Sequence, residues 1–378
     1  MQSQVYINKA NFSDNLKAVK RFAAPQSQLM AVVKSNAYGH GIDLTSGLCE
    51  ESKIVDYFGV VEIQEAIHLR QIGIKLPILV LSYTSICRDL LEEAILRDIE
   101  LSVYDFDTAK NISIEATKVK KDALIHIKIE TGLNRLGFDF NEIDEIKKIS
   151  QLPNIKIKGI FSHFAAAEEA NIQYSTKQIE RLNGFVVSLK KDDLIKDNCL
   201  IHIAASAAGF VLENSRFNLV RSGIAIYGLY PSPEIEKLCL EKKIFLKPVL
   251  SWTTKVLEVK EARVGDSIGY GCTYLVRKPM KIATIAVGYA DGYDRKLSNT
   301  GRVLIDGIIC PIVGRIAMNM VVVDVSKIKK GVKINDEVVL IGRQGKNEIL
   351  ADDLADLVDT INYEVVTRIN WEVKRNLI

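Results

Sequence analysis

The sequence lacks the cysteine and histidine patterns that hold metal ions or disulfide frameworks. Its six cysteines lie far apart, and neither a C-x-x-C pair nor an H-E-x-x-H motif occurs. This spacing argues against a zinc site and against a disulfide-stabilised scaffold. We therefore expect no metal and reduced thiols, mostly in the core, at Cys49, Cys87, Cys199, Cys239, Cys272 and Cys310.

The chain also lacks a long apolar run and an excess of charge. No apolar run approaches the ~20 residues of a membrane span, and Met1–Tyr6 is not a basic segment followed by an apolar one. Fifty basic side chains stand against forty-seven acidic ones, which leaves a net charge of +3. Without long blocks of like charge, neither nucleic acid nor a membrane is indicated as a partner. We expect a cytoplasmic protein that binds a small molecule.

Short apolar, β-branched runs recur eight times between residues 29 and 228. Continuous hydrophobicity is typical of strands that are buried on both faces of a parallel sheet. Helical patterns fill the gaps, as from Ile63 to Ile72, where Gly73 then offers a left-handed cap. Eight alternations favour an α/β fold of the (β/α)8 TIM-barrel type over an open doubly wound sheet, and no G-x-G-x-x-G follows the first run. The runs are Leu29–Val33, Tyr57–Val61, Leu76–Leu81, Ile99–Tyr104, Leu124–Ile129, Ile155–Phe161, Leu200–Ala204 and Leu219–Tyr227.

The pattern changes after the prolines at 231 and 233. We place a domain boundary near 240, with the barrel at 1–240 and a mainly β C-terminal domain at 241–378, to which the first few residues can pair. Asp306-Gly307 between two β-branched runs is a strong hairpin signal. A helical pattern at 349–357 interrupts the β character before the closing stretch Tyr363–Val373.

Residues able to do chemistry fall at or just after the barrel strands, where the active sites of such barrels gather. Lys34 ends the first run and is followed by a polar, glycine-punctuated turn, which suits a catalytic amine on a rigid element. From spacing alone, however, such a lysine is more often a solvated side chain at a strand end. The same alternative, a solvated or structural side chain, stays open on local grounds for Lys128, Arg135, His163 and Arg221.

The string AVVKSNAYGHG at 31–41 closely resembles the cofactor-lysine motif of the bacterial alanine racemases. The resemblance implies that Lys34 binds pyridoxal 5'-phosphate covalently and that Tyr38 forms a hydrogen bond with the phosphate of this cofactor. KIETGLNRLG at 128–137 resembles the segment whose arginine, here Arg135, contacts the cofactor phenolic oxygen and the substrate carboxylate. A guanidinium can grip a carboxylate through two hydrogen bonds. The lysine equivalent to Lys128 is carbamylated in some family members.

Three further barrel segments are similar to racemase segments: SHFA at 162–165, HIAASAA at 202–208 and VRSGIA at 220–225. The resemblance implies that Ser206 binds phosphate, together with the backbone N–H groups that follow Arg221, at Gly223 and Ile224. Arg221 would face the pyridine nitrogen, and a protonated arginine there leaves the ring a poorer electron sink. That favours simple proton return over transamination. His163 would link Arg221 to the second base. The resemblance supports a catalytic role for His202 less strongly than for His163.

In the second domain, SIGYGCTY at 267–274 resembles the segment that carries the second catalytic base, here Tyr270. On local grounds a tyrosine between glycines is more simply a turn aromatic. Racemisation by two bases needs one group on each face of the substrate, and Lys34 and Tyr270 would supply them. A phenol titrates near pH ~10, so nearby positive charge must help it to ionise.

The match continues through AVGYADGY at 286–293, VGRIAMN at 313–319 and INYE at 361–364. It implies that the backbone N–H at Met318 helps to hold the substrate carboxylate, that Arg315 lies on the corridor by which substrate enters, and that Tyr363 reaches the phosphate. Three positions depart from the family: Ala205 replaces a usual asparagine, Ala317 a frequent cysteine and Asn319 the usual aspartate.

The chain is therefore identified as a member of the alanine racemase family. The resemblance implies an isomerase that interconverts L- and D-alanine by two bases, supplies D-alanine for peptidoglycan, and works as a head-to-tail homodimer with sites completed by the partner. Racemisation of serine or of a broader set of amino acids stays open. A barrel-related pyridoxal-phosphate decarboxylase would lack the Tyr270 segment, and a non-catalytic carrier would stop before residues 244–378.

Overall fold

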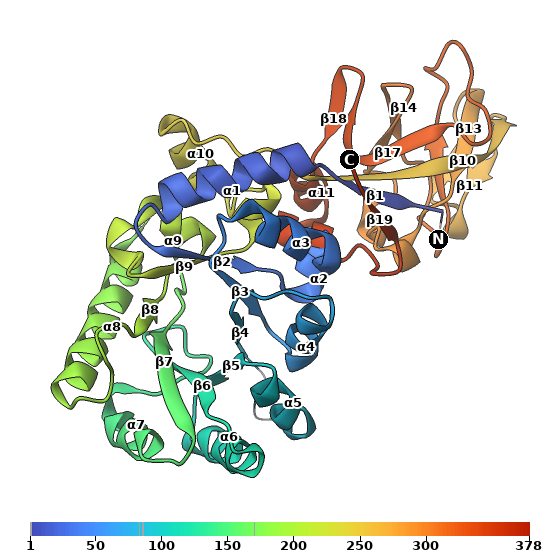
Figure 1. The fold of residues 1–378 in the computed structure, drawn as a ribbon. Coiled ribbons are helices and arrows are strands. Elements are labelled where there is room, and N and C mark those ends of the chain that lie inside the picture. Colours follow the sequence, from blue (N-terminus) through green and yellow to red (C-terminus); the bar gives the residue numbers. More distant parts are fainter. Residues whose placement is uncertain (1, 83, 85–86, 170) are drawn as a thin grey trace. The chain divides into compact units, whose positions relative to one another are not determined.

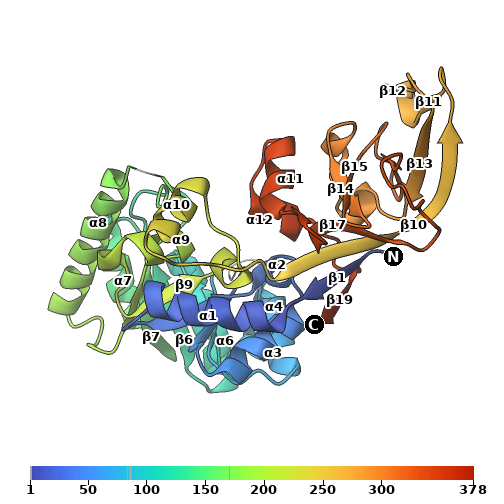
Figure 2. The ribbon, with the colours of Figure 1, turned by 90° about the horizontal axis from the view of Figure 1, so that it is seen from above.

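The computed structural model describes residues 2–82, 84, 87–169 and 171–378, which form two compact units. One unit comprises residues 11–37 and 42–247. The other comprises residues 1–10, 38–41 and 248–378. Figures 1 and 2 show the ribbon from two directions. Within the described ranges, no helix combines the length and the apolar character needed to cross a membrane.

The first unit is a nearly closed barrel of eight parallel strands covered by helices (Figure 1), as the hydrophobic pattern predicts. Neighbouring strands pair in the order β8-β7-β6-β5-β4-β3-β2-β9. The strands are β2 Gln28–Val32, β3 Tyr57–Val60, β4 Ile78–Val80, β5 Ile99–Val103, β6 Ala123–Lys128, β7 Ile155–Phe161, β8 Leu200–His202 and β9 Leu219–Ser222. The helices are α1 Lys9–Ala23, α3 Ile42–Ser52, α4 Ile63–Gln71, α5 Leu91–Leu96, α6 Phe106–Val119, α7 Ile143–Ser150, α8 Gln173–Lys191, α9 Ser206–Val211 and α10 Pro233–Glu241.

Helix α4 shows how the sequence builds the outer layer. Its buried residues Ile63, Ala66, Ile67 and Leu69 form one apolar face. The helix ends where Gly73 adopts a φ of 94°, and the N–H of Gly73 donates to the carbonyl of Arg70 across 3.1 Å. A glycine takes this left-handed conformation without a steric penalty, so the predicted stop signal is confirmed.

The second unit is built on a sheet in the order β15-β14-β17-β10-β1-β19, and β13 also pairs with β10. Figure 2 shows β10 as the long curved strand of this sheet. The amino-terminal strand β1 lies between β10 and β19. The strands are β1 Gln4–Ile7, β10 Leu250–Ala262, β11 Ser267–Ile268, β12 Tyr274–Leu275, β13 Met280–Ile285, β14 Arg302–Ile305, β15 Ile308–Pro311, β16 Val321–Asp324, β17 Glu337–Gln344, β18 Asn347–Ile349 and β19 Lys374–Leu377.

The predicted hairpin is confirmed, because β14 pairs with β15 around Asp306 and Gly307, both at positive φ. The predicted helix is α11, Ala351–Val358. The closing stretch Tyr363–Val373 differs from the expected return to β structure. It begins in helix α12, Asn362–Thr367, and the last strand starts only at Lys374.

Candidate active site

Lys34 stands at the end of β2, where the backbone enters a left-handed turn. Ser35, Asn36 and Ala37 have φ between 52° and 54° and ψ between 46° and 55°, and the N–H of Ala37 donates to the carbonyl of Val33 across 2.9 Å. Three successive non-glycine residues in this conformation are strained, and such strain concentrates at functional sites. The turn follows the candidate catalytic lysine directly.

The surroundings of the Lys34 amine favour its neutral form over its charged form. Burial is the main cause that lowers its pKa, the positive charge of Arg135 lowers it further, and Glu65 opposes the shift. A neutral amine is the form that attacks a carbonyl and accepts a proton. The environment of Lys34 therefore fits the role of a Schiff-base lysine and a base.

Positive side chains gather at the carboxyl ends of the strands. Lys128 ends β6, Arg135 lies in the loop that follows, and Arg221 lies in β9. The charge of Arg135 lowers the pKa of each of the other two, after burial as the first cause; the pKa of Lys128 falls to about 8 and that of Arg221 to about 9. Burial, followed by Arg221 and Arg135, also holds the pKa of His163 well below its ordinary value. Such a cluster favours an anionic occupant.

The guanidinium of Arg221 is fixed by its neighbours on two strands. Nη1 donates to Nδ1 of His202 across 2.8 Å, and Nη2 donates to the carbonyl oxygens of Ser162 and Ile203 across 2.9 and 3.0 Å. Nη2 also lies 3.2 Å from Nδ1 of His163. Because arginine only donates, both imidazole Nδ1 atoms are acceptors here.

Ser206 joins the start of α9 to the turn after β9. Its Oγ accepts the N–H of Gly223 across 3.1 Å and that of Ala225 across 3.5 Å. Ile224, between them, is the other position predicted to contact phosphate. A serine hydroxyl beside successive backbone N–H groups is a suitable anion cradle.

The remaining predicted residues lie in the second unit. The rings of Tyr38 and Tyr363 lie with their centroids 6.1 Å apart. Tyr270 is 70% exposed and opens a short 3-10 turn between Gly269 and Gly271. A Cβ atom added to Gly271 would lie 2.6 Å from Nη1 of Arg315, so the glycine lets the Tyr270 turn approach that arginine.

The Met318 loop packs against the turn that follows β13. The N–H of Ala290 donates to the carbonyl of Met318 across 2.9 Å, and Gly288 allows the same approach, since an added Cβ would lie 2.3 Å from that oxygen. The side chain of Met318 is 55% exposed. The predicted site residues thus form two groups, one in each unit.

Several residues that sequence reasoning passed over belong to the barrel group. The ring of Phe161 stacks on His202, with centroids 5.0 Å apart, and lies 5.7 Å from the ammonium of Lys128. His126 and Glu100 continue the hydrogen bonds of His202 into the barrel interior. The available signal was a charged or imidazole side chain inside an otherwise apolar strand run.

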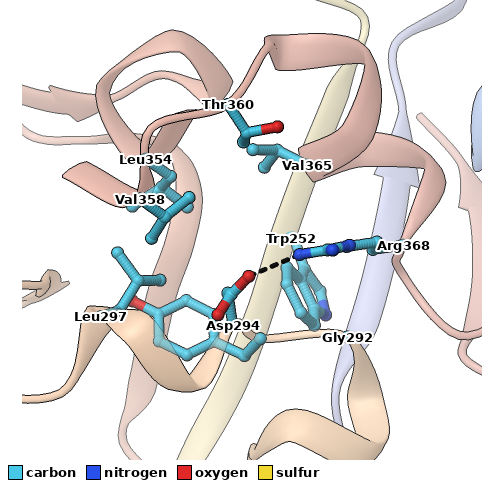
Figure 3. Close-up of a pocket in the computed structure, with 10 residues that line it drawn as sticks. Trp252, Gly292, Asp294, Leu297, Leu354, Val358, Thr360, Val365 and Arg368 are labelled. Carbon is cyan, nitrogen blue, oxygen red and sulfur yellow. Dashed lines mark hydrogen bonds and ion pairs between the residues drawn. The ribbon is translucent and has the colours of Figure 1, made fainter. Parts of the chain in front are cut away.

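A separate cavity of about 20 Å³ lies in the second unit (Figure 3), and none of the predicted site residues lines it. Its lining includes Trp252, Tyr293 and Leu354, and Asp294 pairs with Arg368 at its side. The buried Nε1 of Trp252 has no hydrogen-bond partner among the described residues. This volume is suited to one water molecule.

The barrel group fits pyridoxal phosphate. It offers an amine of lowered pKa at Lys34, a buried guanidinium at Arg221 and a hydroxyl with adjacent N–H groups at Ser206. In the parts of the chain that the structure covers, no cluster of three metal-ligating side chains occurs. Fold and site together define a barrel enzyme whose cationic face suits an anionic cofactor.

Comparison with known proteins agrees with this class. Residues 7–231 match the model of the alanine racemase N-terminal domain, and residues 249–377 match that of the C-terminal domain. The chain is 41% identical to an alanine racemase of Clostridium novyi over 372 residues, which covers 98% of this chain and 93% of that protein. It is 39% identical to one of Methanococcus maripaludis, over 98% and 96% of the two chains.

Solved structures agree as well. Alanine racemase of Clostridium difficile 630 superposes with a TM-score of 0.92 at 34% identity, covering 100% of this chain and 96% of that one. The Bacillus anthracis enzyme, solved with bound L-Ala-P, gives 0.92 at 33% identity, covering 100% and 95%. The chain belongs to the alanine racemase family, whose members are pyridoxal-phosphate-dependent isomerases.

Proposed function

We propose that this protein interconverts L- and D-alanine and thereby supplies D-alanine for peptidoglycan. The observation that carries the proposal is the pairing of a lysine of lowered pKa at the end of β2 with a cationic barrel face, in a chain that matches both alanine racemase domain models. Relatives that match almost the whole chain count against a decarboxylase or a carrier.

We propose that Lys34, Tyr38, His163, Ser206, Arg221, Gly223, Ile224 and Tyr363 hold pyridoxal phosphate. When bound, this cofactor withdraws electrons from the α-carbon of the amino acid and so acidifies its proton. Ser206 and the N–H groups after Arg221 would hold the phosphate, and the guanidinium of Arg221 would supply a hydrogen-bond donor to the ring. Arg135 orients the substrate carboxylate through its guanidinium, with the backbone of Met318 as a second donor. Arg315 guides substrate along the entrance.

Two groups move the α-proton. Nζ of Lys34 takes or returns it on one face of the substrate, and the phenolic oxygen of Tyr270 does so on the other. His163, whose Nδ1 lies beside Nη2 of Arg221, would link Tyr270 to that positive charge and so help the phenol to lose its proton. Removal on one face and return on the other inverts the configuration.

We propose that Lys128 carries a carbamate that pairs with Arg135. Only a neutral amine adds carbon dioxide, and a pKa of about 8 leaves a usable neutral fraction at physiological pH. The new negative charge would also relieve repulsion among Lys128, Arg135 and Arg221.

We further propose a head-to-tail homodimer in which Tyr270 and Met318 of one protomer complete the site around Lys34 of the other. The exposure of these two side chains, together with that of Tyr289 and Met320, supports burial against a partner. Sedimentation tests the oligomeric state.

One assay tests the activity. The purified protein is incubated with pyridoxal phosphate and L-alanine, and D-alanine is measured by chiral separation; the reverse reaction and L-serine are run in parallel. Equal final amounts of the two alanine enantiomers are expected. Protein that is loaded with cofactor but forms no D-alanine would refute the proposal. Faster turnover of serine than of alanine would identify serine as the preferred substrate.

A further inference from the structure

A chain of buried polar side chains crosses the barrel interior behind Arg221. Nη1 of Arg221 lies 2.8 Å from Nδ1 of His202, and Nε2 of His202 lies 3.0 Å from Nδ1 of His126. Nε2 of His126 then lies 2.7 Å from Oε2 of Glu100. All four side chains are at most 4% exposed. Direct side-chain contacts therefore connect β9, β8, β6 and β5.

The direction of every hydrogen bond in this chain follows from its arginine end. Arginine cannot accept, so Nδ1 of His202 accepts and Nε2 of that ring carries the proton. His202 thus donates to Nδ1 of His126, whose proton must sit on Nε2 and point at Glu100. Burial, Arg221 and His126 hold the pKa of His202 well below its ordinary value, which keeps this ring neutral. One cation and one carboxylate are joined through two neutral imidazoles.

Glu100 is the unusual member, because it is a carboxylate inside the fully buried strand β5. Its other oxygen, Oε1, accepts the phenolic proton of Tyr57 across 3.1 Å. The guanidinium of Arg70 lies within electrostatic range, although its hydrogen bonds go to backbone carbonyls of Arg97, Ile74, Leu76 and Asp98. Burying a carboxylate costs free energy unless the charge is paired. The hydrogen-bonded connection from Glu100 to the cation of Arg221 provides such a pairing.

The strands leave room for this chain. A Cβ atom on Gly159 would lie 2.3 Å from Nδ1 of His126, so only glycine at that position of β7 allows the ring its place. Two residues further along β7, the ring of Phe161 is stacked on His202 with an interplanar angle of 7°. Packing holds both imidazoles in one orientation.

We propose that Glu100 is a positioning residue of the active site, which acts through His126 and His202 to hold the guanidinium of Arg221 charged and aimed. Its carboxylate polarises both imidazoles in the same sense, and hydrogen bonds in such a chain strengthen one another. The link from Arg221 to catalysis rests on the proposed function. The donor and acceptor directions of the hydrogen bonds from Arg221 to Glu100 do not depend on the proposed function.

Glu100→Gln tests this proposal because it removes the charge and keeps the shape. Ser102→Ala is the matched control, since Ser102 is buried two residues along the same strand and donates to the carbonyl of Val80 instead. The holoenzyme is labelled with ¹⁵N-histidine, which gives only five imidazoles. Proton and nitrogen resonances of the rings are recorded alongside kcat and KM for alanine.

In the wild type, His126 and His202 are expected as neutral rings with the proton on Nε2. In Glu100→Gln, the Nε2 protons of both rings move upfield, including that of His202, which Glu100 does not touch. kcat falls about tenfold, which corresponds to about 1.4 kcal/mol, with KM within about twofold. Ser102→Ala moves neither resonance.

Tyr57→Phe supplies a second test that does not depend on the folding of Glu100→Gln. It keeps the carboxylate and removes a competing donor, so both Nε2 protons should move downfield. A wild-type His202 protonated on Nδ1, or His202 resonances that move in neither variant, would overturn the proposal. A wild type that shows the predicted tautomers and no racemisation would instead refute the proposed function.

Discussion

The backbone N–H of Ser35 donates to Oε1 of Glu65 across 2.5 Å, which ties the left-handed turn after Lys34 to helix α4. The other oxygen of Glu65 accepts the N–H groups of Val61 and Glu62 at the start of that helix. One carboxylate therefore caps a helix and fixes the backbone next to the candidate catalytic amine. The position of Lys34 depends on the barrel, not on the turn alone.

Replacing this amine tests its role. We expect Lys34→Ala to lose the yellow absorption band of the covalently bound cofactor and at least about 10³-fold in racemisation, because no other amine replaces the Schiff-base lysine and base. Absorption spectra and chiral assays of the purified variant measure both effects. A variant that keeps the band and full turnover would refute the assignment. Lys53→Ala, on the surface of the same unit, is the control.

Removing the phenol should affect the two enantiomers differently. In Tyr270→Phe we expect loss of the α-proton from L-alanine to fall by about 10²–10⁴-fold, with a smaller effect on D-alanine, because the second base acts on one face only. Exchange of the α-proton with deuterated water measures the two rates separately. Exchange at wild-type rates with both enantiomers would count against two separate bases. Tyr274→Phe, in the short strand β12 that follows this turn, should leave the ratio unchanged.

The barrel strands could be predicted because their physical cause is local to each segment. A run such as Ile99–Val103 is buried along its whole length, so its composition alone marks a strand of a covered parallel sheet. The turn at Ser35–Ala37 could not be predicted in its handedness. None of its three residues is glycine, and intrinsic preference favours a right-handed conformation there. Contacts from Glu65 and the side chain of Asn36, which accepts the N–H of Ile42, override that preference.

The site could be predicted only as far as strand ends and motifs reach. Lys34, Arg135 and Arg221 could be singled out because each lies in or just after a strand run, whereas Lys128 was predicted from the family resemblance alone. The path from Glu100 to His202 was not, because it depends on which residues face one another across the barrel. The register of β5 against β6 sets Ser102 beside His126, and that of β7 against β8 sets Phe161 beside His202. A hydrophobic pattern contains no such register.

The lowered pKa of Lys128 predicts a pH-dependent stability. Its pKa is about 8 in the folded chain against 10.5 for an ordinary lysine, so between these values the unfolded state binds more protons and stability rises with pH. Below about pH 8 the folded protein carries the cost of a buried cation. We expect Lys128→Met to be more stable than the wild type there, with the advantage shrinking between pH 8 and 10.5. Urea unfolding in buffer free of carbon dioxide measures it; an advantage that grows with pH would contradict it.

The same residue can be examined for its modification. Holoenzyme equilibrated with ¹³C-bicarbonate should show a carbamate carbon resonance that is absent from Lys128→Met. Lys156→Met, which removes an exposed lysine paired with Asp122, should keep the resonance. A wild type without the resonance under conditions of full activity would exclude the carbamate.

Gly39 shows how closely the second unit packs around the residues that follow the left-handed turn. Its φ is +81°, and an added Cβ atom would lie 2.0 Å from the carbonyl oxygen of Val366. Val366 belongs to helix α12, which also carries Tyr363. Its own carbonyl accepts Nε and Nη2 of Arg375 across 3.1 and 3.0 Å. Gly39→Ala must therefore displace helix α12 or Gly39 itself.

Gly73→Ala separates this steric effect from backbone strain, because Gly73 has a φ of +94° and nothing lies within 4 Å of its added Cβ. We expect Gly73→Ala to cost about 1–2 kcal/mol of unfolding free energy from strain alone. Gly39→Ala should cost about 3–5 kcal/mol and also weaken cofactor binding, since Tyr363 moves with α12. Urea denaturation and cofactor titration of both variants measure the two effects. Equal costs would mean that the contact with Val366 relaxes freely, and the close packing around Tyr38 and Tyr363 would then not depend on glycine.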